Sequence, residues 1–325
     1  MTSTDIAVLA TTEVFGKEIK EVQDKDVLIK VACTIIAILG LIGNSLVLVV
    51  FYKGRELHVV PNILIGHQSL VDLILSFIGF LNVIHFFSEF KPMTIRHPVL
   101  EIFLCKIWFS EYVLWALLQV STINLVFVTM ERYIIVMHPI KYRTIARKKI
   151  SLVVCIFAWF TGFLIKMYKP WIYRISKEDG MCTSQASLET GSSERYVIAL
   201  TSTMTFLIIP AITMAFVHGS VVWTLSSNHF KLSKKIPKGV RDIFTTMIIV
   251  SVAYMICWIP DITLYLHHNL VTPHDWKDLV HRIARILAES NVCVNPIIYI
   301  MKFKTFQRGL KKLVTKSPRR VAREY

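Results

Sequence analysis

Residues 27–52 read VLIKVACTIIAILGLIGNSLVLVVFY, a stretch in which Lys30 is the single charged residue. A helix rises about 1.5 Å per residue, so about 20 apolar residues cross the ~30 Å hydrocarbon core of a bilayer. Because lipid offers exposed amides no hydrogen-bond partners, such a run has to be helical. Mostly uncharged runs of this kind lie at 27–52, 62–87, 102–137, 150–170, 196–226, 240–267 and 281–301. The sequence therefore predicts an all-α protein with seven transmembrane helices.

The composition agrees with a membrane protein. Of the 325 residues, 54% are hydrophobic, and the mean hydropathy is +0.54, which is too apolar for a soluble domain of this size. The stretches 150–170 and 281–301 are the weakest spans, because Lys166, Arg282 and Arg285 lie near their ends. Without one of them, the chain would have six spans and both termini on the same side.

The distribution of basic residues predicts the orientation of the chain. With the N-terminus outside, the inner segments are 53–60, 138–149, 227–242 and 302–325, and they carry 21 Lys and Arg residues. The outer segments carry fewer over a greater length. This bias indicates a multi-pass protein with a cytoplasmic C-terminus and an extracellular N-terminus. The net charge of +15 is then a signal for topology and anionic lipid, rather than for nucleic acid.

The chain is expected to form one transmembrane domain, 27–301, after an extracellular N-terminus, 1–26. The segment 302–325 carries Phe303, Phe306, Leu310 and Leu313 three or four residues apart, with basic residues between them. This spacing predicts a short amphipathic eighth helix on the cytoplasmic membrane surface, followed by a basic tail.

Two of the six cysteines are candidates for a disulfide. Cys105 falls at the outer end of the third span, and Cys182 in the outer loop after the fourth. Because the exterior is oxidising, we expect these two to pair. The others lie within apolar spans, where buried free thiols are usual: Cys33, Cys155, Cys257 and Cys293.

Several polar side chains fall inside the predicted spans. A charged or amide group there is unfavourable unless it faces the interior of the bundle, so each is a functional candidate. They are Asn44, Asp72, Glu131, Arg132, Asn291 and Asn295. Four prolines lie in spans or at their start, where a proline frees a carbonyl and forms a hinge: Pro61, Pro210, Pro260 and Pro296.

These residues belong to short motifs that follow one another along the chain. In order they are Gly43-Asn44, Leu70-Val71-Asp72, Cys105, Glu131-Arg132-Tyr133, His138-Pro139-Ile140-Lys141-Tyr142, Trp159, Pro210, Cys257-Trp258-Ile259-Pro260, Asn295-Pro296-Ile297-Ile298-Tyr299 and Phe306. Together they resemble the rhodopsin-like (class A) family of G protein-coupled receptors. The resemblance implies a receptor, not an enzyme, that converts binding of an extracellular ligand into activation of a heterotrimeric G protein.

The resemblance also implies roles at the inner end of the bundle. Glu131 would neutralise Arg132 at rest, and release of this pair would let Arg132 meet the C-terminal helix of a G protein α subunit. Ile140, just after Pro139, is similar to the family's apolar plug into that subunit. The remaining residues of this switch are Tyr133, Asn295, Pro296 and Tyr299.

Deeper in the bundle, the resemblance makes Trp258 a toggle, with the sixth span pivoting about Pro260. Below Trp258 it implies a sodium ion held by oxygen ligands, from Asp72, Ser121, Asn291 and Asn295. The alternative for each polar residue is a helix–helix hydrogen bond without a switching role. His67 and Gln68 replace the family's usual Asn and Leu just before Asp72.

Two departures from the family pattern bear on function. Between Cys105 and Arg132 there are 26 residues, two more than the family usually shows. Either the top of this helix bulges or the disulfide begins in the loop, so the alignment of Glu111 and Tyr112 to the ligand pocket is open. Val240 stands where the family often has an acid that holds the arginine. We therefore expect raised ligand-free signalling.

The ligand is narrowed by two exclusions. Leu114 replaces the aspartate of amine receptors, and Glu289 replaces the retinal-binding lysine of visual pigments, so no Schiff base can form there. The expected pocket comprises Glu111, Tyr112, Trp115, Asp261, Tyr265, Arg285 and Glu289. Either Asp261 and Glu289 hold a cationic ligand, or Arg285 pairs internally with Glu289 four residues later. The aromatic lining favours a peptide or a small cationic molecule.

Other classes of membrane protein are less consistent with the sequence. A transporter or channel predicts inverted repeats, matching broken helices or a charged pore stripe. A membrane enzyme predicts clustered metal ligands or a nucleophile with its base. We find none of these patterns in the sequence, so the receptor interpretation is favoured and no cofactor beyond the sodium ion is expected.

Overall fold

The computed structural model describes residues 3–53, 60–87, 97–138, 140–142, 148–176, 182–184, 192–226, 238–271 and 278–315. Pro139, the side chain of Val240 and the basic tail from residue 316 onward lie outside this description. The predictions that involve them are therefore not addressed by the structure.

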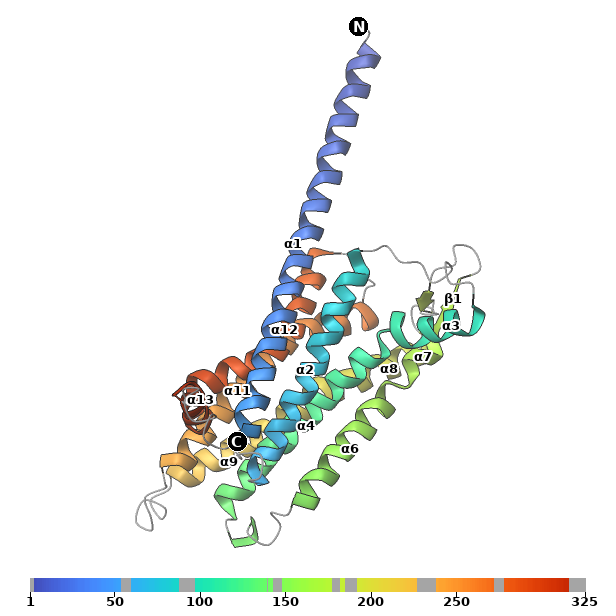
Figure 1. Cartoon of the computed structure of the whole chain (residues 1–325). Coiled ribbons are helices and arrows are strands. Elements are labelled where there is room, and N and C mark those ends of the chain that lie inside the picture. Colours follow the sequence, from blue (N-terminus) through green and yellow to red (C-terminus); the bar gives the residue numbers. More distant parts are fainter. Residues whose placement is uncertain are drawn as a thin grey trace.

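Within the described residues, seven helical segments are long and apolar enough to cross a membrane. They are Val27–Lys53, Asn62–Val83, Pro98–Ile135, Lys148–Ile172, Ser193–Thr224, Phe244–Leu270 and Leu279–Lys302. The predicted number of spans is confirmed, including the two that carry Lys166, Arg282 and Arg285. Figure 1 shows them gathered into one bundle.

Some of these spans consist of a single helix, and others of two or three joined segments. The single helices are α1 (Ser3–Lys53), α2 (Val60–Phe87), α11 (Lys238–Leu270) and α12 (Leu279–Lys302). The third span joins α3 (Pro98–Phe103), the π-helix η3 (Leu104–Phe109) and α4 (Tyr112–Met137). The fourth joins α6 (Lys148–Lys166) and α7 (Tyr168–Ile172), and the fifth joins α8 (Ser193–Thr203), the π-helix η4 (Met204–Ile208) and α9 (Ile209–Ser226).

The outer end of the third span is interrupted. After η3, the helix breaks at Ser110 and Glu111, and Glu111 has a φ of 55°, a left-handed conformation that is unfavourable for a residue with a side chain. A π-helix accommodates extra residues within a span. Because Cys105 lies within η3, the two extra residues are absorbed by a bulge in the helix and not by the loop.

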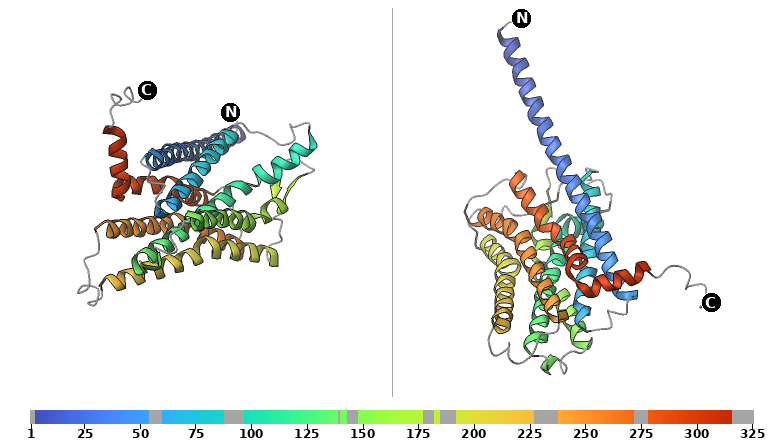
Figure 2. Two further views of the ribbon diagram at one scale, coloured as in Figure 1. Left: turned by 60° about the horizontal axis from the view of Figure 1, so that its bottom comes forward. Right: turned by 90° about the vertical axis from the view of Figure 1, so that its left-hand side faces the viewer.

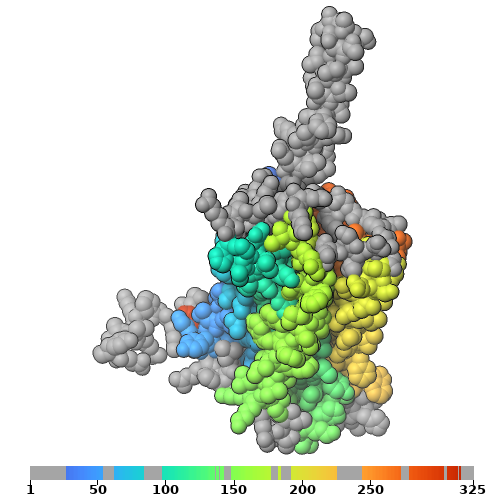
Figure 3. All heavy atoms as spheres, turned by 90° about the vertical axis from the view of Figure 1, so that its right-hand side faces the viewer, coloured from blue at the N-terminus to red at the C-terminus, as the bar shows by residue number. Residues whose placement is uncertain are grey.

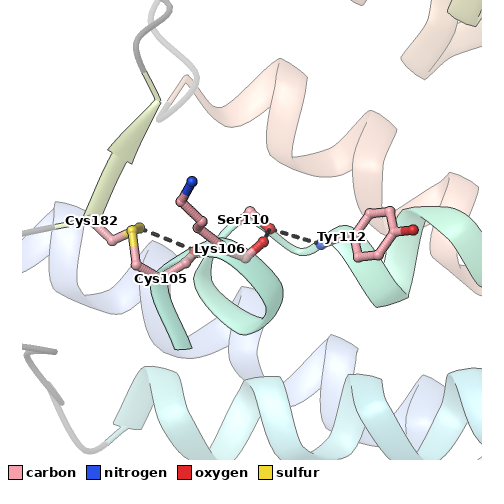
Figure 4. The surroundings of a disulfide bond; sticks show 5 residues. All are labelled: Cys105, Lys106, Ser110, Tyr112 and Cys182. Carbon is pink, nitrogen blue, oxygen red and sulfur yellow. Dashed lines mark hydrogen bonds between the residues drawn. A yellow bond between two sulfur atoms is a disulfide. The ribbon is translucent and has the colours of Figure 1, made fainter. Parts of the chain in front are cut away.

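A disulfide fixes this interrupted end to the loop after the fourth span. Strands β1 (Tyr173–Ile175) and β2 (Cys182–Ser184) form an antiparallel pair in which Ile175 lies opposite Cys182. Cys182 is bonded to Cys105, as predicted, with the two Cα atoms 5.4 Å apart. Figure 4 shows the strand meeting the π-helical turn just before Ser110 and Tyr112.

The short helix α13 (Lys304–Thr315) follows the last span and turns away from it, past the inner end of α1 (Figure 2). Phe306 is fully buried, and its ring meets Phe51 of α1 edge-on at 6.3 Å. A Cβ atom on Gly309 would approach Val50 to 2.7 Å, so only glycine allows this close contact. The predicted amphipathic eighth helix is confirmed, and α1 is its packing partner.

The bundle buries polar side chains within its apolar core and exposes apolar side chains on its outside. The face in Figure 3 is formed largely by α6 in green and by α8 to α9 in yellow. Phe160 of α6 and Phe216 of α9 are among the exposed apolar side chains of these helices. Inside, the Asn44 amide donates to the carbonyls of Gly40 and Val292 and so joins α1 to α12. Outward apolar surface of this kind is suited to lipid.

Candidate functional site

A buried carboxylate joins three spans at the centre of the bundle. Asp72 of α2 is fully buried. Its Oδ1 accepts a hydrogen bond from Ser121 of α4 at 2.9 Å, and its Oδ2 accepts one from Asn295 of α12 at 3.0 Å. Asn291 is buried one turn earlier on α12. The four residues predicted for the sodium site therefore lie in the interior, and three of them are in direct contact.

The arrangement around Asp72 does not fit a sodium ion. Gln68 lies one turn before Asp72, and its amide nitrogen is 3.1 and 3.2 Å from the two carboxylate oxygens. The same nitrogen is 2.5 Å from the Ser121 hydroxyl. Sodium requires oxygen lone pairs, whereas these positions are taken by N–H donors. The sequence prediction carried the sodium site over from the family although Gln68 replaces the family's usual leucine, and the Gln68 amide is the reason for the difference.

Trp258 of α11 lies between the Asp72 carboxylate and the outer part of the bundle. Its ring stacks on Phe206 with the ring centroids 4.5 Å apart. The Tyr254 hydroxyl donates to the carbonyl of Phe206 at 2.6 Å and lies 3.1 Å from the Thr122 hydroxyl. Pro210, four residues after Phe206, has no N–H for that carbonyl. Tyr254 therefore satisfies the group that the proline frees, and it connects α11 to η4 and α4.

Above Trp258 lies a cavity of about 380 Å³, which we call the main cavity. Of the predicted pocket residues, it is lined by Glu111, Trp115, Asp261, Tyr265 and Arg285. Lys166 also lines it, although its side chain is only 2% exposed. The Lys166 ammonium lies 4.4 Å from the centroid of the Phe206 ring, and no ion pair with a carboxylate is found among the described residues. A buried lysine inside a span without an anion is a candidate ligand contact.

Three predicted pocket residues form an ionic cluster at the outer end. Arg285 of α12 donates to Glu111 and, at 3.0 Å, to Glu289 one turn later. Glu111 also accepts from the indole N–H of Trp115 at 3.0 Å. Of the two alternatives drawn from the sequence, this is the internal pairing of Glu289. It accounts for the unusual backbone of Glu111, because the left-handed conformation is held in place by two side-chain contacts.

The remaining predicted pocket residues lie elsewhere. Glu289 lines a second cavity of about 310 Å³, with Lys30 and Cys33, and does not line the main cavity that contains Asp261. Tyr112 lines neither cavity. Its hydroxyl donates to the Phe163 carbonyl of α6 at 3.2 Å, and its ring meets Phe163 edge-on. Asp261 and Glu289 therefore line different cavities, although these share Glu111, Arg282 and Arg285 as lining residues. Tyr112 joins the third span to the fourth.

At the inner end, Arg132 and Glu131 lie together. Arg132 is buried, and its guanidinium is 4.0 Å from the Glu131 carboxylate, a long ion pair. The Tyr142 hydroxyl donates to Glu131 at 3.3 Å. Ile140, just before it in the same loop, is 82% exposed. Tyr142 therefore contacts the ion pair, whereas Ile140 in the same loop points away from it into solvent.

The other inner residues form a packed group. Tyr133 lies near the rings of His138 and Phe216, at 6.0 and 6.4 Å. Tyr299 is buried and packs on Phe303 at 5.9 Å. Pro260 and Pro296 lie inside α11 and α12, where each removes one helical hydrogen bond. These helices therefore have built-in positions at which they can bend.

Three residues of the site, Gln68, Lys166 and Tyr142, were noted in the sequence but were not assigned to it. Gln68 stands four residues before Asp72, a spacing that brings two side chains of one helix together. Lys166 lies two turns after Trp159, so both are on the same face of α6. These spacings could have indicated both residues. Nothing in the sequence indicated that Tyr142 would reach back to Glu131, because this contact depends on the path of the loop.

A bundle of seven membrane helices, with a cavity at one end and a buried arginine at the other, is the architecture of a membrane receptor. Residues 43–299 match the family described as 7 transmembrane receptor (rhodopsin family). The chain belongs to this family. Membership confirms the receptor prediction and excludes the transporter, channel and enzyme alternatives.

Known receptors are similar to this chain over most of its length. Bombesin receptor subtype-3 of Ovis aries is 25% identical, with 87% of this chain and 73% of the relative covered. Neuropeptide Y receptor type 6 of Oryctolagus cuniculus is also 25% identical, over 88% of this chain and 80% of the relative. Galanin receptor type 2 of Mus musculus is 22% identical, over 92% and 80%.

Proposed function

We propose that this protein is a plasma-membrane receptor that binds an extracellular peptide in the main cavity and activates a heterotrimeric G protein at its cytoplasmic end. The observation that carries the ligand class is the mixed charge of that cavity. Lys166 and Asp261 both line it, and neither forms an ion pair with a described residue. A peptide offers negative and positive groups on one chain, and a small amine offers one sign. The names of the similar receptors for bombesin, neuropeptide Y and galanin support the same class.

The path from ligand to G protein starts at the floor of the main cavity. Phe206 lines the cavity and stacks on Trp258, so a ligand that moves Phe206 also moves Trp258. Pro260, half a turn beyond Trp258, gives α11 a place to bend. Movement of α11 would separate the inner ends of the bundle and free Arg132 from Glu131. The switch then involves Tyr133, Asn295, Pro296 and Tyr299 as predicted.

The cytoplasmic surface is suited to a protein partner. Ile140 is a large apolar side chain in solvent, and with Pro139 it would insert into the G protein α subunit. On the same side, α13 presents basic residues such as Arg308 and Lys311. These favour contact with anionic lipid of the inner leaflet and hold the C-terminus in the cytoplasm. The N-terminus is then extracellular.

Raised ligand-free signalling remains part of the proposal. Val240 supplies no acid for Arg132, and the Glu131 ion pair is long at 4.0 Å. A longer ion pair with Glu131 stabilises the resting arrangement less than a close one would, and so leaves a larger share of molecules in the active arrangement.

The test is a panel of sensors for each G protein subtype in cells that express the receptor, first without ligand and then with libraries of synthetic peptides. We expect at least one subtype to respond above cells with empty vector, and Arg132→Ala to abolish the response. We expect Lys166→Met and Asp261→Asn to lower the potency of any active peptide about tenfold or more, which corresponds to one lost charged contact. Lys30→Met is the matched control, because Lys30 lines the second cavity. Silence of every subtype in both arms would contradict the proposal.

A further inference from the structure

The carboxylate of Asp72 is surrounded by donors from three helices. Gln68 donates to both of its oxygens, Ser121 to Oδ1 and Asn295 to Oδ2. Gln68 is 1% exposed, so its amide is part of the interior and not of a solvent channel. An isolated buried carboxylate is very unfavourable, and a bound cation is one way to neutralise it. Here the protein supplies hydrogen-bond donors on every side instead.

The direction of the Gln68 amide is fixed by a chain of hydrogen bonds. The indole of Trp159 donates to Nε2 of His67 at 2.8 Å. An indole N–H can only donate, so this His67 nitrogen accepts and the proton is on Nδ1. That Nδ1 lies 2.9 Å from Oδ1 of Asn124, which therefore accepts. The side chain of His67 is thus neutral in this arrangement.

The chain then continues to Asp72. With its oxygen accepting from His67, Asn124 turns its amide nitrogen to the Gln68 oxygen at 2.7 Å and to the Leu64 carbonyl at 3.1 Å. Gln68 must therefore direct its own amide nitrogen to Asp72. A reversed amide would place two N–H groups against each other at Asn124 and an oxygen against the carboxylate. The orientation of the Gln68 amide is therefore fixed by the indole N–H of Trp159 through His67 and Asn124, and not by an assignment made at Gln68 itself.

The length of the side chain matters as well. Residues four apart on a helix are neighbours, and glutamine has the reach to place its nitrogen between both oxygens of Asp72 and the Ser121 hydroxyl. Leucine at the same position would fill space without a donor. Asp72 would then keep the Ser121 and Asn295 bonds alone, and its carboxylate would have lone pairs open to a cation.

We propose that the Gln68 amide takes the place of a sodium ion at Asp72, so that the resting state of this receptor is stable without sodium. Gln68 and Asp72 lie on the same helix, and the hydrogen bonds through Asn124, His67 and Trp159 hold the Gln68 amide in place. It goes beyond the proposed function, because it needs neither a ligand nor a G protein.

The test measures thermal unfolding of the purified full-length receptor, without ligand, in sodium chloride and in choline chloride of equal ionic strength. We expect the native protein to have the same Tm in both salts. We expect Gln68→Leu to unfold at a lower temperature in choline and to gain about 2–4 °C in sodium, as binding of a ligand to the folded state would produce. Gln68→Met, which has nearly the same shape without a donor, should behave like Gln68→Leu.

Two controls locate the effect. Ser69→Ala changes a buried residue next to Gln68 whose hydroxyl bonds only the Ile65 carbonyl among the described contacts, so it should leave the sodium response absent. Adding Asp72→Asn to Gln68→Leu should remove the response to sodium. A clear rise of the native Tm in sodium would overturn the proposal. So would folded Gln68→Leu and Gln68→Met proteins that ignore sodium, because the amide would then not be what excludes the ion.

Discussion

The third span is held differently at its two ends. At the outer end, Cys105 is covalently bonded to Cys182, and Arg285 bonds both Glu111 and Glu289. At the inner end, the contacts of Glu131 that the structure describes are a 4.0 Å ion pair with Arg132 and one hydrogen bond from Tyr142. Interactions of different strength at the ends of one element allow one end to stay fixed while the other moves. We therefore expect the outer end of the third span to stay fixed and the inner end to rearrange when the receptor is activated.

This comparison predicts that substitutions at the outer end have the larger effect on stability. Arg285→Met removes the cation between Glu111 and Glu289 and leaves two carboxylates close together. We expect a loss of about 1–2 kcal/mol, which is less than for a fully buried pair because 40% of the Arg285 side chain is exposed. The measurement is the Tm of the purified receptor.

Glu289→Gln is the matched control for that experiment. It leaves Arg285 paired with Glu111 and Glu111 bonded to Trp115, so we expect a smaller fall in Tm. Equal losses for the two variants would show that the cluster does not hold the outer end, and the comparison of the two ends would fail.

The middle of the bundle should give an intermediate effect. Tyr254→Phe removes the hydroxyl that bonds the Phe206 carbonyl at 2.6 Å and contacts Thr122. A carbonyl freed by Pro210 would then be buried without this donor. We expect a cost of about 1 kcal/mol, because the helix can relax around the carbonyl. We expect a lower Tm and higher ligand-free signalling, because Phe206 and Trp258 become easier to move.

Thr122→Val tests which of the two contacts matters. It removes the partner hydroxyl but leaves Tyr254 bonded to the Phe206 carbonyl, so its Tm should fall less than that of Tyr254→Phe. The reverse order of losses would assign the stabilisation to the contact between α4 and α11 and not to the proline carbonyl.

Much of the fold could be predicted from the sequence, because each span is specified by its own apolar length and the interior polar residues stand in recognisable motifs. The number of spans, the disulfide between Cys105 and Cys182 and the amphipathic helix after Phe303 all follow from local patterns. The two extra residues between Cys105 and Arg132 predicted an irregularity in the third span. The structure places it at the π-helix η3 and at Glu111.

The site was less predictable, because its contacts depend on how the spans turn relative to one another. Tyr112 faces α6 and Glu289 faces the second cavity, and neither orientation is encoded in spacing along the chain. Gln68 shows the opposite case. Its position one turn before Asp72 could be read from the sequence. The family pattern nevertheless led us to expect a sodium ion at Asp72, where this chain places the amide of Gln68.

The smallest effect is expected at the inner end, from Tyr142→Phe. The lost hydroxyl makes one hydrogen bond of 3.3 Å to Glu131, so the change should be about 0.5 kcal/mol, or roughly twofold in ligand-free G protein signalling, with little change in Tm. Burial, and then the charge of Glu131, raise the pKa of Tyr142. A raised pKa keeps the hydroxyl protonated, so its contribution is complete below a pH of about 10 and is lost only as the pH rises through the raised value. The signalling difference between native and Tyr142→Phe receptors should therefore be the same at about pH 6 and about pH 8. A fall in Tm as large as that of Arg285→Met would show that the inner end is as firmly held as the outer one, and the receptor would then need another place to move.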